Sequence, residues 1–491
     1  MSKEEFPFDN YSKLKEKSVE VSDLLAKSEK TIAIVAKAHP DNISATGIIL
    51  SCLRKLEKGS HAIILDYLED IEKRIKNTDY SIFIFIGFEI KELPEKILKD
   101  ESKQIIIIEH KFKIDKRVKI PWERLHILSL DSFELATNLL SNSGLAYLIA
   151  SGFNNDYYRY AGLAILGGLS KKQIDQKSQK LIGINLLILE EGKENKVLRE
   201  TTGTRIPGRE SQPIHLALKF SNNPFFPGLT GNEPACTSFI SRLGISMKDQ
   251  DGNFRTISSL TSEETKKLND GLITLLMGEK GQPLTEISKL IGPIYIQEIE
   301  TKKNQLRNIE EYLWILNGAT QLKKYGLALA VVLGDRENIY DKLMRELSNY
   351  HGKATTIIEE IIQNPNIAEE RPYFRLIKNQ DFFEFESAPL VIKALVDSNI
   401  IPIDKPLILH IKENSENYLF IHDSPINMKT GYLAFQIFQE LRKEEDFQDL
   451  SVKGDIDFFY TYIKEDKLEL FLEELEKKFT YHYKGKDSDN K

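Results

Sequence analysis

Polar side chains that could bind a metal or carry protons follow two apolar runs of the chain. His39 and Asp41 come directly after the run TIAIVA, in KAHPDNISAT, while Glu109 ends the run QIIIIE and His110 follows it. Imidazole nitrogens and carboxylate oxygens bind divalent metals and act as acids and bases in catalysis. These four residues form a candidate site if the fold brings the two runs together.

The elements around these residues predict a parallel α/β sheet. Short apolar runs rich in β-branched residues occur at five places, and amphipathic stretches such as 44–57 lie between several of them. Continuous apolar strands joined by crossover-length segments indicate a parallel sheet with both faces covered. Loops after the carboxyl ends of such strands carry ligands and catalytic groups. The predicted strands are 31–36, 61–66, 82–86, 104–109 and 125–130.

The rest of the chain predicts a connector and a second α/β domain. Helical patterns dominate 133–198, and the stretch TTGTRIPGRESQPIH then has the Gly, Pro and Thr content of turns and linkers. We predict four parts: an α/β domain (1–198), a helical connector with Gly/Pro-rich loops (199–322), a second, smaller α/β domain (323–481) and a disordered tail (482–491).

Apolar patterns also predict the individual elements of these later parts. In the connector they are helices at 235–245, 261–277 and 283–291, and a long helix at 299–322. In the second domain they are a strand in YGLALAVVLGD (325–335), helices near 336–363 and 386–398, strands at 406–412 and 417–422, and a final helix at 466–479.

Composition excludes several classes of protein. The 491 residues hold 67 Lys and Arg against 74 Asp and Glu, and this net charge of −7 argues against a broad nucleic-acid-binding surface. Cys52 and Cys236 lack metal-ligand spacing, which excludes a Cys-based zinc site and fits a reducing compartment. No apolar run reaches the length of a membrane span, and MSKEEFPFDN carries no apolar signal region. We expect a cytoplasmic, nucleoid-associated protein of two or three domains.

The three strand ends, in the order KAHPDNISAT, IFIFIGF and EHK, resemble the motifs of the DHH phosphoesterase superfamily, and of its RecJ group in particular. In that group, an Asp-rich first motif, an Asp before a Gly and an Asp-His-His triplet hold two divalent metals. The segments GRESQPIHLALKFSNNPFFPGLTGNEPA and LRNIEEYLWILNGATQLKKYGLALAVVLGD look like the connector and the start of the second domain of archaeal RecJ-like proteins. The resemblance covers about residues 30–480.

This resemblance implies a fold and a set of partners. The fold is a DHH-type parallel-sheet domain, a helical connector and a second, smaller α/β domain of the DHHA type. The archaeal subgroup associates with GINS and is related to cell division cycle protein 45, a subunit of the eukaryotic CMG helicase. GINS, the MCM helicase and single-stranded DNA are therefore the expected partners.

The same resemblance implies that the metal site has been lost. The motif positions are occupied by His39, Asp41, Phe85, Glu109, His110 and Lys111. Phe85 offers no ligand where the family places an Asp, and Lys111 puts a positive charge where a cation would be bound. Two-metal hydrolysis needs several carboxylates to bridge the ions. We predict no catalytic residue, no metal and no cofactor. The alternative is one Mn²⁺ or Mg²⁺ ion held by His39, Asp41, Glu109 and His110.

Nucleic-acid contacts are predicted at three positions. RecJ-type enzymes use a Gly-Gly-Gly-His loop near the C-terminus on the substrate phosphate, whereas DLSVKGDIDFFYTYIKEDKLELF offers only Gly454 and no His. His422, in YLFIHDS, lies near the position of an Arg that the family uses on nucleic acid. Arg205 and Arg209 are candidates for contacts with nucleic acid or with acidic groups of a partner, and solvated side chains are the alternative.

Structural roles compete with each of these assignments. Asp41 is suited to cap a helix that begins near Ser44, because Asp accepts hydrogen bonds from free N–H groups there. Glu109 and Lys111 could form a surface ion pair, which contributes little stability, and His110 could be a packed strand-end residue.

We therefore predict a catalytically inactive RecJ-like scaffold that binds GINS and, through it, MCM. The alternative is a single-strand-specific, metal-dependent exonuclease with a remodelled site. A nucleotide-binding regulator on the same fold is a third possibility, for which the sequence has no positive feature.

Overall fold

The computed structural model describes most of the chain between residues 7 and 487. The residues within this span that it does not describe are 67, 69–70, 72–78, 112–121, 154–155, 222–223, 225, 278–286, 288–289, 303, 365–366, 379–382, 399–400, 403, 414–415, 425–433 and 455–457.

The chain forms two compact units. Unit 1 comprises Met1–Ile214, Lys248–Asn269 and Ser288–Leu347. Unit 2 comprises His215–Met247, Asp270–Ile287 and Ser348–Lys491. The four parts predicted from the sequence, with boundaries at 198, 322 and 481, remain a prediction.

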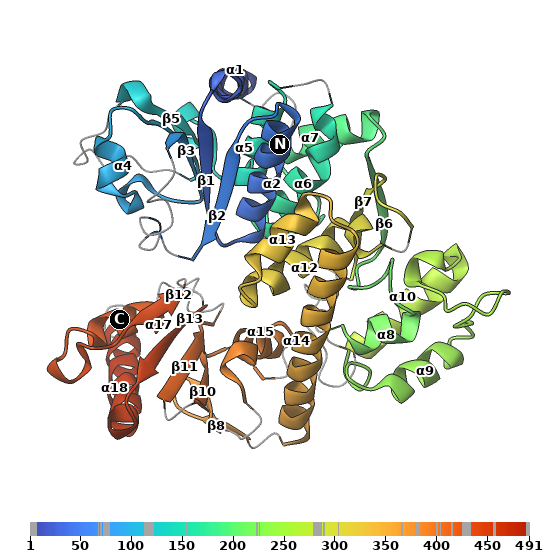
Figure 1. Cartoon of the computed structure of the whole chain (residues 1–491). Helices are drawn as coiled ribbons and strands as arrows, with labels where there is room; N and C mark the ends of the chain where they lie inside the picture. The colour runs from blue at the N-terminus through green and yellow to red at the C-terminus, as the bar shows by residue number, and fades with distance from the viewer. Residues whose placement is uncertain are drawn as a thin grey trace. The chain divides into compact units, whose positions relative to one another are not determined.

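Unit 1 is built on the predicted parallel sheet (Figure 1). Its strand order is β2-β1-β3-β4-β5, and every neighbouring pair is parallel. All five strands lie where the apolar runs predict them, within two residues at either end. They are β1 (Thr31–Lys37), β2 (Ser60–Leu65), β3 (Tyr80–Ile86), β4 (Gln104–Ile108) and β5 (Leu125–Leu128).

Helices cover both faces of this sheet because its strands are apolar on both sides. One face packs on a large core that includes α2 (Pro40–Lys55), and the other packs on a smaller core that includes α4 (Glu95–Lys99). Further helices that contribute to the large core include α1 (Phe8–Lys27), α5 (Asn142–Ala150), α6 (Ala161–Ser170), α7 (Ile184–Glu194), α12 (Ile309–Gln321) and α13 (Tyr325–Val332).

Two predicted elements of unit 1 are wrong. The helix predicted at 299–322 begins only at Ile309, because the Asn308 side chain accepts the backbone N–H groups of Glu310 and Glu311 and caps the helix there. The predicted strand in 325–335 is the helix α13. A short run that is apolar on every side has no periodicity to separate helix from strand.

An antiparallel ribbon of two strands was not predicted. β6 (Leu198–Thr204) pairs with β7 (Ile291–Gln297) across a long intervening segment. The helix predicted at 283–291 falls largely outside the described residues, and its last residue begins β7.

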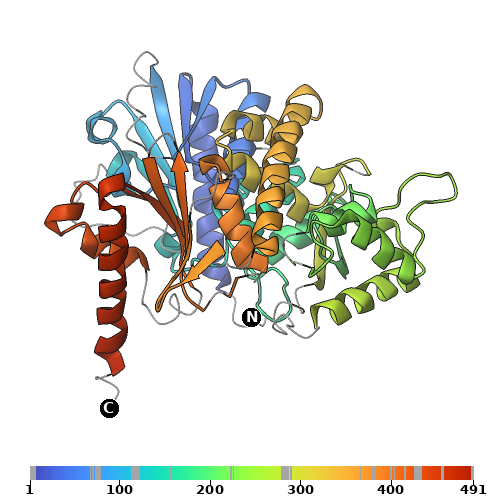
Figure 2. The same cartoon turned by 90° about the horizontal axis from the view of Figure 1, so that it is seen from below.

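Unit 2 contains a mixed six-stranded sheet in the order β12-β13-β11-β10-β9-β8. α17 (Ala434–Leu441) and α18 (Leu468–Asp487) pack on one face, and α15 (Ala388–Ser398) packs on the other (Figure 2). The strands are β8 (Ala368–Glu370), β9 (Arg375–Ile377), β10 (Leu407–Glu413), β11 (Glu416–His422), β12 (Val452–Gly454) and β13 (Phe458–Ile463). A mixed α/β chain with two sheet domains is confirmed.

The remaining helices belong to the connector and to the transition between the units. They are α8 (Ile214–Lys219), α9 (Glu233–Arg242), α10 (Ser262–Leu276) and α14 (Asn338–Gln363). α18 runs to Asp487, and the disordered tail predicted for 482–491 remains a prediction. Among the described helices, none combines the length and the apolar character that a membrane crossing needs.

Candidate functional site

Asp41 is buried at the start of α2, and its carboxylate caps a different helix. One oxygen accepts the backbone N–H of Asn142 at 3.0 Å, and the other accepts the N–H of Ser143 at 2.8 Å. These are the first two residues of α5, whose N–H groups have no partner within their own helix. The sequence predicts a capping role for Asp41, but on its own helix. The structure corrects this because α2 begins at Pro40, before Asp41.

His39 is the N-cap of α2. Its backbone is extended, and its Nδ1 accepts the N–H of Asp41 at 3.3 Å. Burial, with a further contribution from the nearby Lys171, lowers the pKa of His39 to about 4, so the ring is neutral at pH 7. A neutral ring is required for this contact, because only an unprotonated nitrogen can accept the N–H.

Asn142 joins the ends of two strands. Its side-chain oxygen accepts the N–H of His110 at 2.7 Å, and its amide nitrogen donates to Asn42 at 2.9 Å and to Glu109 at 3.4 Å. Asn42 in turn donates to the carbonyl of Lys37, the last residue of β1. We call Asp41, Asn42, Glu109, His110 and Asn142 the strand-end network. The motif segments after β1 and β4 therefore do meet, as the sequence predicts.

Glu109 and His110 form a pair within this network. The Nδ1 of His110 lies 2.7 Å from the Glu109 carboxylate and 3.2 Å from the side-chain oxygen of Asn142. Both neighbours accept, so Nδ1 carries the hydrogen. Burial would raise the pKa of Glu109, but His110 and the N–H of Lys111 hold it below its usual value. The predicted ion pair between Glu109 and Lys111 is wrong: the partner is His110, and Lys111 contributes its backbone N–H.

A lysine outside the motif segments acts on this cluster. Lys171 is the C-cap of α6 (Ala161–Ser170). Burial would raise the pKa of Asp41, but the charge of Lys171 and the neighbouring His39 keep it below the usual value for an Asp. The ammonium of Lys171 therefore helps to balance the negative charge of the buried Asp41 carboxylate.

Phe85 lies on the other face of the sheet. Its buried ring belongs to the core that includes α4, and it stacks on Phe83 with ring centroids 6.1 Å apart. The strand-end network instead adjoins α2 and α5, which pack on the opposite face. Phe85 is therefore a core residue that cannot contact the network.

Two glycines permit the close packing around the network. Gly87, after β3, has a φ of +81°, and a Cβ there would lie 2.2 Å from the amide nitrogen of Asn42. A Cβ on Gly167 of α6 would lie 1.9 Å from the Ser143 hydroxyl and 2.2 Å from an Asp41 oxygen. No side chain fits at either position while the network is formed.

The residues predicted to contact nucleic acid have partners within the protein. Arg205 donates to the Glu310 carboxylate and to Gln179 at 3.2 Å. Arg209 is mostly buried, with its Nε 3.4 Å from Glu210, and burial lowers its pKa. His422 ends β11 in unit 2, where its Nδ1 lies 2.8 Å from the carbonyl of Asp423. Their contact with nucleic acid remains a prediction.

The chain is similar to known proteins in sequence over one segment and in structure over nearly its whole length. Residues 206–291 match the family described as the DHH-CID domain. CDC45 from Entamoeba histolytica has a similar structure, with a TM-score of 0.65 and 14% identity over 95% of this chain and 99% of that one. The chain has the fold of the DHH superfamily.

Two further DHH-fold structures are similar at lower scores. Exonuclease RecJ bound to manganese has a TM-score of 0.53 and 13% identity over 95% of this chain and 94% of that one. RecJ from Thermus thermophilus, in complex with Mn²⁺, has a TM-score of 0.50 and 13% identity over 95% of this chain and 54% of that one. No curated protein matches the chain in sequence. The predicted fold class is confirmed.

The residues of this DHH fold do not fit a pair of divalent cations. Both oxygens of Asp41 already accept backbone N–H groups, Lys171 adds a positive charge, and Phe85 lies on the other face. Within the described ranges, no three His, Cys, Asp or Glu side chains are grouped so that they could hold a metal ion. The alternative set of His39, Asp41, Glu109 and His110 is thus not arranged as a ligand set.

Proposed function

We propose that this DHH-fold protein is a non-catalytic replication factor that acts by binding other proteins. The supporting observation concerns Asp41, the one residue of the first motif that carries a carboxylate. Both of its oxygens accept backbone N–H groups at the N-terminus of α5. A carboxylate that bridges two metal ions in a hydrolase must direct its oxygens at the ions instead. The network thus supports a structural role for the strand ends.

GINS is the proposed partner, and MCM is reached through it. The similarity to CDC45 extends over nearly the whole of both chains, which supports a role of the complete fold rather than of one domain. Family resemblance supplies the names of the partners, and we propose a place at the replication fork in the cytoplasm, near the nucleoid.

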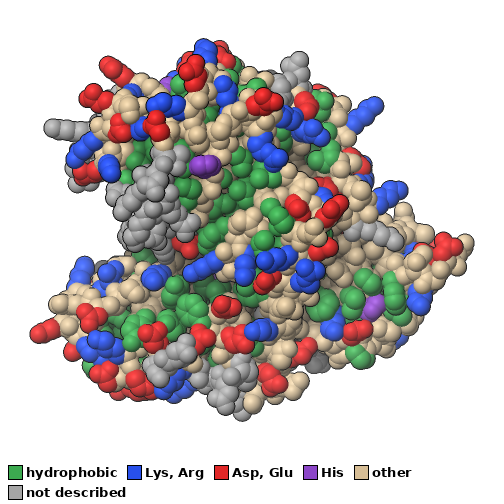
Figure 3. Space-filling model, in the orientation of Figure 1, with side chains coloured by type: hydrophobic (Ala, Val, Ile, Leu, Met, Phe, Trp, Pro, Cys, Tyr) green, Lys and Arg blue, Asp and Glu red, His purple; other side chains and the backbone are tan. Residues whose placement is uncertain are grey.

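Single-stranded DNA is a secondary candidate ligand. On the face shown in Figure 3, Lys and Arg side chains are interspersed with Asp and Glu. Together with the net charge of −7, this mixed distribution favours a protein partner over a long tract of nucleic acid. A short contact with a single strand remains compatible with it.

Co-purification with GINS from the same organism tests the proposal. The full-length protein and GINS are mixed at moderate salt after nuclease treatment, so that DNA cannot bridge them, and are separated by size. We expect one complex, and Lys111→Ala at the exposed end of the motif should leave it intact. Failure to form a complex both with and without added single-stranded DNA would refute the proposed function.

A further inference from the structure

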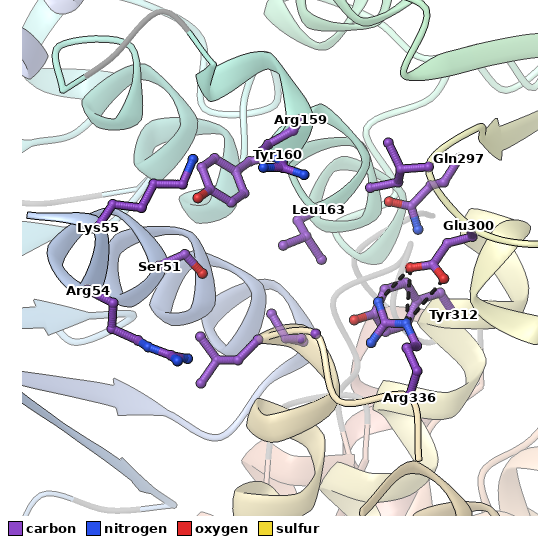
Figure 4. Close-up of a pocket in the computed structure, with 14 residues that line it drawn as sticks. Ser51, Arg54, Lys55, Arg159, Tyr160, Leu163, Gln297, Glu300, Tyr312 and Arg336 are labelled. Carbon is purple, nitrogen blue, oxygen red and sulfur yellow. Dashed lines mark hydrogen bonds and ion pairs between the residues drawn. The ribbon is translucent and has the colours of Figure 1, made fainter.

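A pocket of about 490 Å³ lies within unit 1, away from the strand-end network. One wall is the end of α2, with Ser51, Arg54 and Lys55, and the facing wall carries Glu300, Tyr312 and Arg336 (Figure 4). Its volume is within the range of pockets that hold small molecules, which is on the order of 300–1,000 Å³.

This pocket is separate from the strand-end network. Asp41 stands in the first turn of α2 and Lys55 is the last residue of that helix. Fourteen residues of α-helix, at about 1.5 Å each, separate the two by roughly 20 Å. A ligand in the pocket would therefore not touch the strand-end network.

Positive charge is concentrated at the end of α2 and in the turn before α6. Arg54 and Lys55 belong to the last turn of α2, and Arg159 comes from the turn that precedes α6. Asp156 neutralises this group only in part, because it is shared between Lys55 at 2.8 Å and Arg159 at 3.3 Å. Arg54 forms no ion pair with any residue that the structure describes. A local excess of cations in a chain of net charge −7 indicates an anionic ligand.

The facing wall is fixed and polar. Arg336 forms a two-pronged ion pair with Glu300 through Nε and one terminal nitrogen, and its other terminal nitrogen donates to the carbonyls of Val331 and Asp335. Such a clamp holds the guanidinium in one orientation. The side chain is thus ordered before any ligand arrives.

A buried tyrosine hydroxyl also lines the pocket. Tyr312 is 2% exposed, and Arg336 acts on its hydroxyl both electrostatically and through a side-chain hydrogen-bond contact. A hydroxyl has one donor and two acceptor positions, so it keeps capacity for ligand atoms or ordered water. Apolar side chains, among them Leu163 and Leu333, also line the pocket.

We propose that this pocket binds a small phosphate-bearing molecule of nucleotide size. Guanidinium groups match the oxygens of phosphate in a two-pronged geometry, and the cations of the α2 wall exceed the charge of a single carboxylate. The apolar and tyrosine-lined part takes the uncharged portion of the ligand. An acidic peptide would instead need a longer groove. The proposal does not depend on the proposed function.

Calorimetry on the full-length protein tests this assignment with four probes: ATP, inorganic triphosphate, adenosine and a peptide of glutamates. We expect saturable binding of ATP, weaker binding of triphosphate and still weaker binding of adenosine. Arg54→Glu and Arg159→Glu should each weaken ATP binding at least tenfold. The control Arg345→Glu, at an exposed position on α14, should change it less than twofold.

Three outcomes would overturn the assignment. The first is that neither ATP nor triphosphate binds. The second is that the glutamate peptide binds as tightly as ATP, which would make the ligand a carboxylate-bearing partner. The third is that Arg54→Glu and Arg159→Glu bind ATP as the wild type does, which would place the nucleotide elsewhere.

Discussion

Removing the carboxylate of Asp41 should destabilise the protein. Both of its oxygens accept N–H groups at the start of α5, at 3.0 and 2.8 Å, and the residue is fully buried. Asp41→Ala leaves two buried donors without partners, at about 1–3 kcal/mol each. Asp41→Asn keeps one acceptor oxygen, so roughly half of that cost remains. We expect losses of unfolding free energy of about 3 kcal/mol for the alanine variant and ~1.5 kcal/mol for the asparagine variant.

The sign of this effect separates a structural carboxylate from a catalytic one. If the role of Asp41 were to bind metal ions, its negative charge would be poorly balanced in the metal-free protein. Neutralising it in Asp41→Asn would then leave the free energy of unfolding unchanged or increase it. Urea unfolding followed by circular dichroism gives the free energies, and hydrogen exchange of residues 141–150 shows whether the start of α5 loosens. Asp23→Asn, at an exposed position on α1, is the control and should stay within about 0.5 kcal/mol of the wild type.

Lower pH should remove the difference in unfolding free energy between the wild type and Asp41→Asn. The pKa of Asp41 is held below its unfolded value of 3.8, so its stabilisation is complete above that pH and is lost as the pH falls through the lower folded pKa. Unfolding free energies of wild type and Asp41→Asn should therefore converge at acid pH. Equal stability at pH 7, or a more stable Asp41→Asn, would refute the structural role of Asp41.

Two further predictions concern residues near the network and in the connector. Gly167→Ala should destabilise the protein by about 1–3 kcal/mol, because the new Cβ meets the Ser143 hydroxyl and the immobilised Asp41. Gly326→Ala is the control, because a Cβ at that position has no atom within 4 Å, and it should be neutral or slightly stabilising. Equal melting temperatures for the two variants would contradict the close packing at Gly167. Burial raises the pKa of Glu311 to about 8, although Glu210 and Ser211 donate to it, so the folded protein retains a proton that the unfolded chain releases near 4.5. Stability should fall as the pH rises from 4.5 to 8, by up to about 1.4 kcal/mol per unit, and Glu311→Gln should remove that dependence in pH-resolved urea unfolding.

The first sheet was predictable because its strands are local signals. Each apolar run is continuous, so β1 to β5 follow from the apolar pattern, and their parallel pairing follows from the crossover segments. The pairing of β6 with β7 was not predictable, because it joins residues far apart in the chain through a Gly- and Thr-rich run without alternation. The sequence predicts a strand in place of the helix α13 because its eight residues are apolar on every side.

The candidate site was predictable only as a set of positions. The motif segments identify Asp41, Glu109 and His110, and the structure does bring them together. Their partners Asn142 and Lys171 come from segments that resemble ordinary helix ends, and only the fold places them there. The polar Ser-Asn-Ser run that caps and begins α5, directly before its apolar residues, is the one signal that could have indicated Asn142. The motif resemblance places Phe85 at the site. Because side chains alternate between the two faces of a strand, the ring of Phe85 instead lies on the opposite face of the sheet.

Nuclease activity is the most direct test of the account. The full-length protein is incubated with end-labelled single-stranded DNA and with RNA, in excess Mn²⁺ and in excess Mg²⁺, and the products are separated on a denaturing gel. We predict that both substrates remain intact at every time point, because Asp41 is occupied by the N-terminus of α5 and Phe85 offers no ligand. Degradation by the wild type that depends on the metal and disappears in Asp41→Asn would contradict the central claim that the strand ends of this DHH fold are structural.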